Sequence, residues 1–190
     1  MWIGIMKDMK AQLSKTTLTL HWLVGVTVIL LLIVGFYMDA AKARELYPIH
    51  KSIGMLVLVL AVVRILWRIR QGWPQPLTDN LLQIGLARIA HWILITVTII
   101  MPVSGMVMSA MGGHGLILFG WELVAANPDP NNLEKVIAVD KGLAKLAKSV
   151  HESCAYIAAL IVTIHILASL YHHLLKKDGT LERMLGKKVE

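Results

Sequence analysis

Residues 150–175 read VHESCAYIAALIVTIHILASLYHHLL, and this stretch decides the fold. Apart from Glu152, it contains no Asp, Glu, Lys or Arg. A helix of about 20 apolar residues crosses about 30 Å of hydrocarbon, so we predict a transmembrane helix here. His151 and His165 lie 14 residues apart within it. Fourteen residues are close to four helical turns, so both side chains share one face, about 21 Å apart.

Three more apolar segments of similar length precede this one. They lie at residues 18–38, 49–69 and 89–109. The chain is 56% hydrophobic and only 16% charged, with a mean hydropathy of +0.64. Soluble domains carry about 25% charged residues, so this composition excludes a soluble globule as well as a disordered chain. We predict one all-α domain over residues 1–190, a transmembrane four-helix bundle.

The connecting segments carry turn signals. The uncharged run from 89 to 121 is longer than one crossing needs, and GGHG at 112–115 is typical of a turn that ends the third span. NPDPNN at 127–132 breaks any helix. We expect residues 131–150 to form an amphipathic helix leading into the fourth span. Residues 1–15 have the composition of a short interfacial helix.

Basic residues predict how the chain lies in the membrane. Twelve of the nineteen Lys and Arg fall on the side that holds the N-terminus, the second loop and the C-terminal tail. Positively charged loops stay in the cytoplasm, so both termini are expected there. The formal net charge of +7 then reflects topology, with the lipid bilayer as partner and no nucleic acid.

The cysteine content limits the cofactors that the chain can hold. Cys154 is the only cysteine in the sequence. It excludes an intramolecular disulfide, a four-thiolate iron–sulfur cluster and covalent haem attachment through C-x-x-C-H. Histidine remains as the obvious ligand type.

Most of the histidines fall within or at the edges of the predicted spans. Ionisable residues in a membrane are costly and usually functional. Six of the eight histidines are placed this way: His21, His50, His91, His151, His165 and His172.

Depth in the membrane predicts how four of these histidines pair. His151 and His165 on one helix are spaced to give one axial ligand to each of two stacked haems, which each need a partner from another helix. His21 matches His165 in depth near the cytoplasmic boundary, and His50 matches His151 at the periplasmic boundary. The alternative is that some of these are interfacial histidines hydrogen-bonded at helix ends.

Arg64 lies near the cytoplasmic end of the second span, one turn before Arg68. A guanidinium there can pair with haem propionates through two hydrogen bonds. The competing interpretation is snorkelling to lipid headgroups. Arg64 is the stronger candidate because it lies deeper.

Several segments together resemble the bacterial cytochrome b561 family of four-helix di-haem proteins of the inner membrane. The likeness rests on HW at 21–22, HKSIGMLVLVLAVVRILWRI at 50–69, AHWILITVTIIMPVSGMVM at 90–108, HES at 151–153, the step to His165, and HHLLKKDGTLERM at 172–184. It implies two non-covalent b haems on His21, His50, His151 and His165, electron exchange with a ubiquinone pool on the cytoplasmic side, and an inner-membrane location. In part of the family, it implies periplasmic superoxide as the electron donor.

A quinone near the cytoplasmic haem needs polar groups. His172 lies close to two helical turns beyond His165, and His91 opens the third span at the same side. Either can donate a hydrogen bond to a quinone carbonyl or relay its protons. Alternatively, both are interfacial histidines or propionate partners.

Three functions fit these residues. The leading hypothesis is a superoxide:ubiquinone oxidoreductase. The second is a non-enzymatic cytochrome b subunit that receives electrons from a redox protein within a larger dehydrogenase or hydrogenase complex. The third is a haem-free histidine-lined bundle that conducts metal ions or protons.

Overall fold

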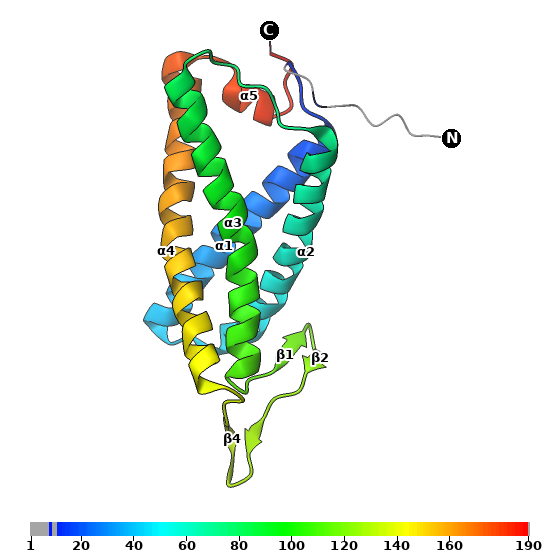
Figure 1. The fold of residues 1–190 in the computed structure, drawn as a ribbon, viewed down its shortest axis with the longest axis vertical. Helices are drawn as coiled ribbons and strands as arrows, with labels where there is room; N and C mark the ends of the chain where they lie inside the picture. The colour runs from blue at the N-terminus through cyan, green and yellow to red at the C-terminus, as the bar shows by residue number, and fades with distance from the viewer. Residues whose placement is uncertain (1–7, 9–10, 190) are drawn as a thin grey trace, which may run out of the picture.

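The computed structural model describes residue 8 and residues 11–189, and four long helices dominate this part of the chain (Figure 1). The helices are α1 (Lys15–Ala41), α2 (Tyr47–Gln71), α3 (Leu81–Met111) and α4 (Lys141–Tyr171), with the 3-10 turn η1 (Arg44–Leu46) between the first two. All four are long and apolar enough to cross a membrane. The predicted transmembrane four-helix bundle is confirmed.

Polar side chains fix where three of the helices begin. The side chain of Ser14 accepts a hydrogen bond from the Thr17 amide, that of Asn80 from Gln83, and that of Asp140 from Leu143. Such caps satisfy backbone amides that have no partner within the helix. α3 and α4 therefore begin eight and nine residues before the predicted spans at 89 and 150, because a capped helix continues past the apolar segment.

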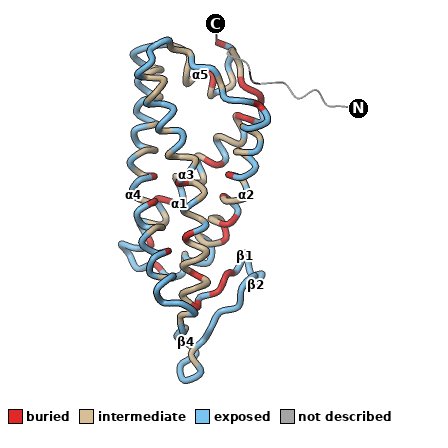
Figure 2. Tube along the Cα trace, viewed as in Figure 1, coloured by how far each residue is buried: buried red, intermediate tan, exposed pale blue. Residues whose placement is uncertain are grey.

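The bundle has an apolar core, and its outer surface also carries many exposed apolar side chains. Leu32, Val97, Cys154 and Ala158 form a buried cluster between α1, α3 and α4. Figure 2 shows buried positions along the inner faces and exposed positions along the outer faces of the helices. Exposed apolar surface of this kind is suited to lipid. α3 packs closely along α4, whereas α1 meets α4 over a much shorter length.

The segment between α3 and α4 differs in part from the structure that the sequence predicts. α3 ends at Met111, directly before GGHG, as predicted. Two antiparallel hairpins follow, β1 (Leu116–Leu118) with β2 (Trp121–Val124), and β3 (Pro128–Asp129) with β4 (Asn132–Val136). The amphipathic helix predicted from residue 131 is therefore wrong over its first part. NPDPNN turns the chain back on itself and residues 132–136 pair as a strand, so the helix begins only after its cap at Asp140.

Both ends of the described chain meet at the end of the bundle opposite the hairpins (Figure 1). α4 continues into a π-helical turn, η2 (His172–Lys176), and then α5 (Thr180–Met184) folds back across the helix ends. The Val189 amide donates to the Ala11 carbonyl at 3.0 Å, and Trp22 Nε1 donates to the Met184 carbonyl at 2.8 Å. Most of the interfacial helix predicted at 1–15 lies outside the described residues, and residues 11–14 are not helical.

Candidate cofactor site

Two histidine pairs lie inside the bundle, one toward each end. The ring centres of His21 on α1 and His165 on α4 are 6.4 Å apart, and those of His50 on α2 and His151 on α4 are also 6.4 Å apart. The structure thus brings together both pairs that depth predicted. A metal bound between two opposed imidazoles through bonds of about 2 Å separates the ring centres by about 6 Å. Each pair has the spacing that one haem iron requires.

The ring of His151 is held by α3. Its Nδ1 lies 2.8 Å from the Met101 carbonyl oxygen. A carbonyl can only accept, so Nδ1 donates and the lone pair at Nε2 is free for a metal. Such a backbone partner orients a ligating histidine and fixes its tautomer. Gly105 leaves room for the ring, because a Cβ there would lie 3.1 Å from His151 Cε1.

The ring of His50 lies against α1. A Cβ added at Gly35 would be 3.4 Å from His50 Cε1, an ordinary contact distance, so the ring lies directly beside this glycine. His50 Nδ1 is buried and has no hydrogen-bond partner within the described part of the chain. Buried polar atoms are nearly always satisfied, so an orphaned one is expected beside a group that the polypeptide does not supply.

The other pair has two further polar neighbours. Arg64 Nη2 lies 2.9 Å from His21 Nδ1, and the ring centre of His91 lies 5.5 Å from that of His165. Arginine has no acceptor atom, so it donates to Nδ1 and the hydrogen of this imidazole sits on Nε2. Binding iron through His21 Nε2 therefore requires Arg64 to move away from the ring. Arg64 and His91, predicted from sequence as propionate and quinone contacts, both lie at this pair.

His172, the second predicted quinone contact, is paired with a residue that the sequence analysis missed. Its Nδ1 is hydrogen-bonded to the Asp178 carboxylate. Burial raises the pKa of Asp178, but hydrogen bonds from Thr180 and His172 outweigh burial and hold it below its ordinary value of 3.8. Lys177 and Gly179 have φ of 52° and 76° and turn the chain back. Helical spacing could not reveal a partner placed by such a turn.

Arg68, the weaker propionate candidate, is engaged elsewhere. Its Nη1 lies 2.9 Å from Asp8 Oδ2, and their side chains are 15% and 2% exposed. Burial raises the pKa of the Asp8 carboxyl, yet hydrogen bonds from Ser14 and Thr17 and the charge of Arg68 hold it below 3.8. Arg68 thus fastens the segment before α1 to α2.

Other features of the bundle suit a flat macrocycle. A Cβ added at Gly25 or Gly54 would meet no atom within 4 Å, so both helices leave open space at these points. Among the residues that the structure describes, no three His, Cys, Asp or Glu side chains gather to hold a metal ion. A haem requires only two axial histidines from the protein, because the porphyrin supplies the other ligands of the iron.

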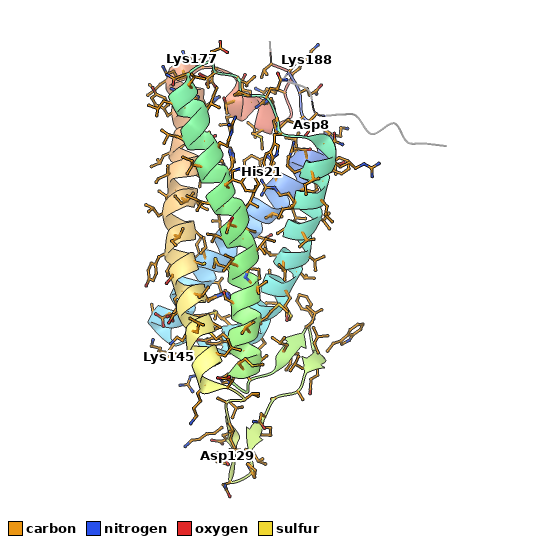
Figure 3. All side chains as sticks on the ribbon, viewed as in Figure 1. Asp8, His21, Asp129, Lys145, Lys177 and Lys188 are labelled. Atoms are coloured by element: carbon orange, nitrogen blue, oxygen red, sulfur yellow. The ribbon has the colours of Figure 1, made fainter. Side chains whose placement is uncertain are left out.

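Figure 3 places the two ends of the site in the molecule. His21 lies in the half of the bundle that also carries Asp8 and Lys188, and Lys145 and Asp129 mark the opposite end. These features define a class: an integral membrane protein of four helices with a histidine pair toward each end of its interior.

The chain belongs to the prokaryotic cytochrome b561 family, whose model matches residues 12–187. "Cytochrome b561 homolog 2" of Escherichia coli (strain K12) is 32% identical over 176 residues, which cover 88% of this chain and 87% of the relative. "Probable superoxide oxidase CybB" of Yersinia pestis is 30% identical over 191 residues, covering 95% and 99%. The resemblance seen in the sequence is confirmed, and membership implies b-type haem and membrane electron transport.

Proposed function

We propose that this chain binds two b haems and transfers electrons from periplasmic superoxide to ubiquinone, as a superoxide:ubiquinone oxidoreductase of the bacterial inner membrane. The observation that carries the proposal is the equal spacing of 6.4 Å in two histidine pairs at opposite ends of one bundle. The similarity to a protein named as a superoxide oxidase supports the choice of donor.

In this proposal each pair has a defined task. His50 and His151 hold the haem iron nearer the hairpins, and His21 and His165 hold the iron nearer the termini. Bound there, the irons supply carriers of single electrons. The orientation follows the positive-inside rule, so the termini are cytoplasmic and the hairpins periplasmic. Once displaced from His21, Arg64 is free to pair with a propionate.

The overall reaction needs protons as well as electrons. Two superoxide ions each give up one electron and leave as O₂, and ubiquinone takes up two electrons and two protons to become ubiquinol. We assign quinone contact to His91, whose ring lies beside the pair of His21 and His165. The hydrogen-bonded pair of His172 and Asp178 lies at the termini end, with each side chain 20% exposed, and can hold a proton for the quinone.

Purification of the full chain tests the proposal directly. We expect a reduced-minus-oxidised spectrum with a b-type α band and about two haems per chain. Superoxide added to this protein should reduce ubiquinone with the stoichiometry above. A haem-loaded chain that passes no electrons from superoxide to quinone would instead favour the electron-transfer subunit of a larger complex. A chain without haem would refute the proposal and favour the histidine-lined conduit.

Histidine variants test the pairing separately from turnover. His50→Ala should remove one of the two haems and leave the other, and His151→Ala should remove the same one. His114→Ala is the matched control, because His114 is exposed in the loop after α3. Loss of both haems or of neither in His50→Ala would contradict the assigned pairs.

A further inference from the structure

The hairpin formed by β1 and β2 exposes large apolar side chains. Between residues 116 and 124 the only charged residue is Glu122. Exposed fractions are 44% for Ile117, 56% for Phe119, 77% for Trp121 and 54% for Leu123. Large exposed apolar side chains gathered on one short hairpin are typical of a site of interaction with another molecule or a membrane.

The hairpin packs against the first turns of α2, a helix apolar enough to span a membrane. Ser52, in the second turn of α2, is 2% exposed, and its Oγ accepts from the Phe119 amide at 3.0 Å. The same Oγ lies 3.2 Å from the Ile117 carbonyl oxygen. Figure 1 shows β1 and β2 beside the end of α2, whereas β4 extends past the helix ends. The tip of the first hairpin is therefore held against the side of an apolar span.

The turn of this hairpin has an unusual residue, because a phenylalanine occupies a position with positive φ. Leu118 pairs with Trp121, so the turn consists of Phe119 and Gly120, with φ of 48° and 94°. Two-residue turns with both φ values positive favour Asn-Gly. A bulky residue in this conformation is uncommon and strained. The bond to Ser52 holds the backbone of this turn, but the side chain of Phe119 is more than half exposed and gains little from packing within the described chain.

We propose that the β1–β2 hairpin is an interfacial anchor that inserts Phe119 and Trp121 into the lipid bilayer at the hairpin end of the bundle. Trp121 shares one face of the hairpin with its partner Leu118, whereas Glu122 lies on the other face with its partner Ile117, so the hairpin can turn Trp121 to lipid while the carboxylate stays on the opposite face. Aromatic side chains favour the zone between headgroups and acyl chains, where backbone groups on the hairpin edges can still meet water. Lipid contact also accounts for an aromatic residue at the strained turn position.

The β3–β4 hairpin differs from the β1–β2 hairpin in its charge. It belongs to the same loop, but residues 128–136 include Asp129, Glu134 and Lys135. Leu133 on β4 is 79% exposed, about as much as Trp121. Because the two positions differ in surroundings and hardly in exposure, they form a matched pair for labelling.

Cysteine labelling in nanodiscs tests the anchor. Trp121→Cys and Leu133→Cys are each made in a Cys154→Ala background, loaded with haem, and inserted at one chain per disc of phosphatidylcholine and phosphatidylglycerol. A membrane-impermeant maleimide should label position 121 about tenfold more slowly than position 133. Both should react at equal rates after unfolding in dodecyl sulfate. Equal rates in nanodiscs would overturn the proposal.

Two further measurements keep the outcome decisive. If position 121 is protected only in discs that hold several chains, the hairpin contacts a second copy and the lipid anchor is refuted. Adding Phe119→Asn, the residue type that this turn prefers, should raise the labelling rate at position 121 severalfold. An unchanged rate there would show that Phe119 takes no part in insertion. Haem content and thermal unfolding serve as folding checks for every variant.

Discussion

At the scale of single residues, Gly105 is the position where one added carbon atom tests the pair of His50 and His151. An alanine Cβ would lie 3.1 Å from His151 Cε1 and 3.2 Å from Nδ1, closer than ordinary van der Waals contact. The ring would have to move away from the Met101 carbonyl that orients it. We expect Gly105→Ala to lower the haem content toward one per chain, measured from pyridine haemochrome spectra.

Gly85→Ala is the control for this substitution. Gly85 lies on the same helix, and a Cβ there meets no atom within 4 Å. Alanine in a helix is favoured over glycine by about 0.5–1 kcal/mol, so this variant should keep both haems and unfold at the same or a slightly higher temperature. A full haem content in Gly105→Ala would mean that the fit of His151 against α3 does not govern ligation.

A substitution at Asp178 tests the proposed delivery of protons to the quinone. Its carboxylate is hydrogen-bonded to His172, and hydrogen bonds hold its pKa below the ordinary value, so it is ionised at neutral pH. Asp178→Asn removes that charge and should slow ubiquinone reduction about a hundredfold or more, the scale of a lost proton-transfer group. The α band should stay unchanged, since neither residue is a proposed iron ligand.

The matched control is Glu182→Gln, which removes a carboxylate that lies 3.8 Å from Lys187 Nζ. Equal turnover in the two variants would assign the pair of His172 and Asp178 a structural role. Steady-state rates between pH 6 and 8 add a second readout. Only a proton-transfer role predicts that the pH profile changes shape in Asp178→Asn.

The sequence predicted the two histidine pairs because the position of a residue along an apolar helix gives its depth in the membrane. The depth of His21, His50, His151 and His165 follows from counting along apolar spans, and the structure places these rings side by side. The partner of His151 could not be found this way, because it is a backbone carbonyl of another helix. The tautomer that Arg64 imposes on His21 likewise depends on side-chain positions.

At the scale of elements, the segment before α1 is fastened to α2 by Asp8 and Arg68. Their atoms lie 2.9 Å apart in a nearly buried position. Removing one partner of a buried ion pair destabilises a protein by about 3–5 kcal/mol. Asp8→Asn keeps some hydrogen bonds to Ser14 and Thr17, so we expect a loss near the lower end, measured as a decrease in thermal stability in detergent at pH 7.

The same pair gives the chain a specific pH dependence. The pKa of Asp8 is lowered in the folded state, so the carboxylate contributes its full stability above the ordinary value of 3.8. That contribution is lost as the pH falls through the lower folded-state pKa. The difference in stability between the wild type and Asp8→Asn should therefore shrink as the pH is lowered below 3.8. A difference that stays constant down to pH 2 would contradict the ion pair.

The elements themselves were predictable to different degrees. All four spans were identified because long uncharged runs are a strong signal. The hairpins were missed since strands of two to five residues carry little periodicity, and β1 lies inside the same uncharged run as α3. α5 was missed because its five residues are held by contacts with distant segments, such as Trp22 with Met184.

At the scale of the whole molecule, α4 connects the two ends of the site. It carries His151 and His165, which are about 21 Å apart along the axis in a hydrocarbon layer of about 30 Å. If superoxide is oxidised at the hairpin end and quinone reduced at the termini end, each electron moves across about 0.7 of the membrane. A potential of 100 mV, negative at the termini side, then opposes that movement by about 1.6 kcal/mol per electron.

This charge movement makes the reaction sensitive to membrane potential. In proteoliposomes given superoxide from outside, only chains with the hairpin end outward can react. A potassium diffusion potential that is negative inside should slow ubiquinone reduction, and one that is positive inside should accelerate it. The protein in detergent, where no potential exists, should respond to neither potassium gradient. Rates that ignore both signs of the potential would place donor and quinone at the same end of the bundle, and the second histidine pair would then need another role.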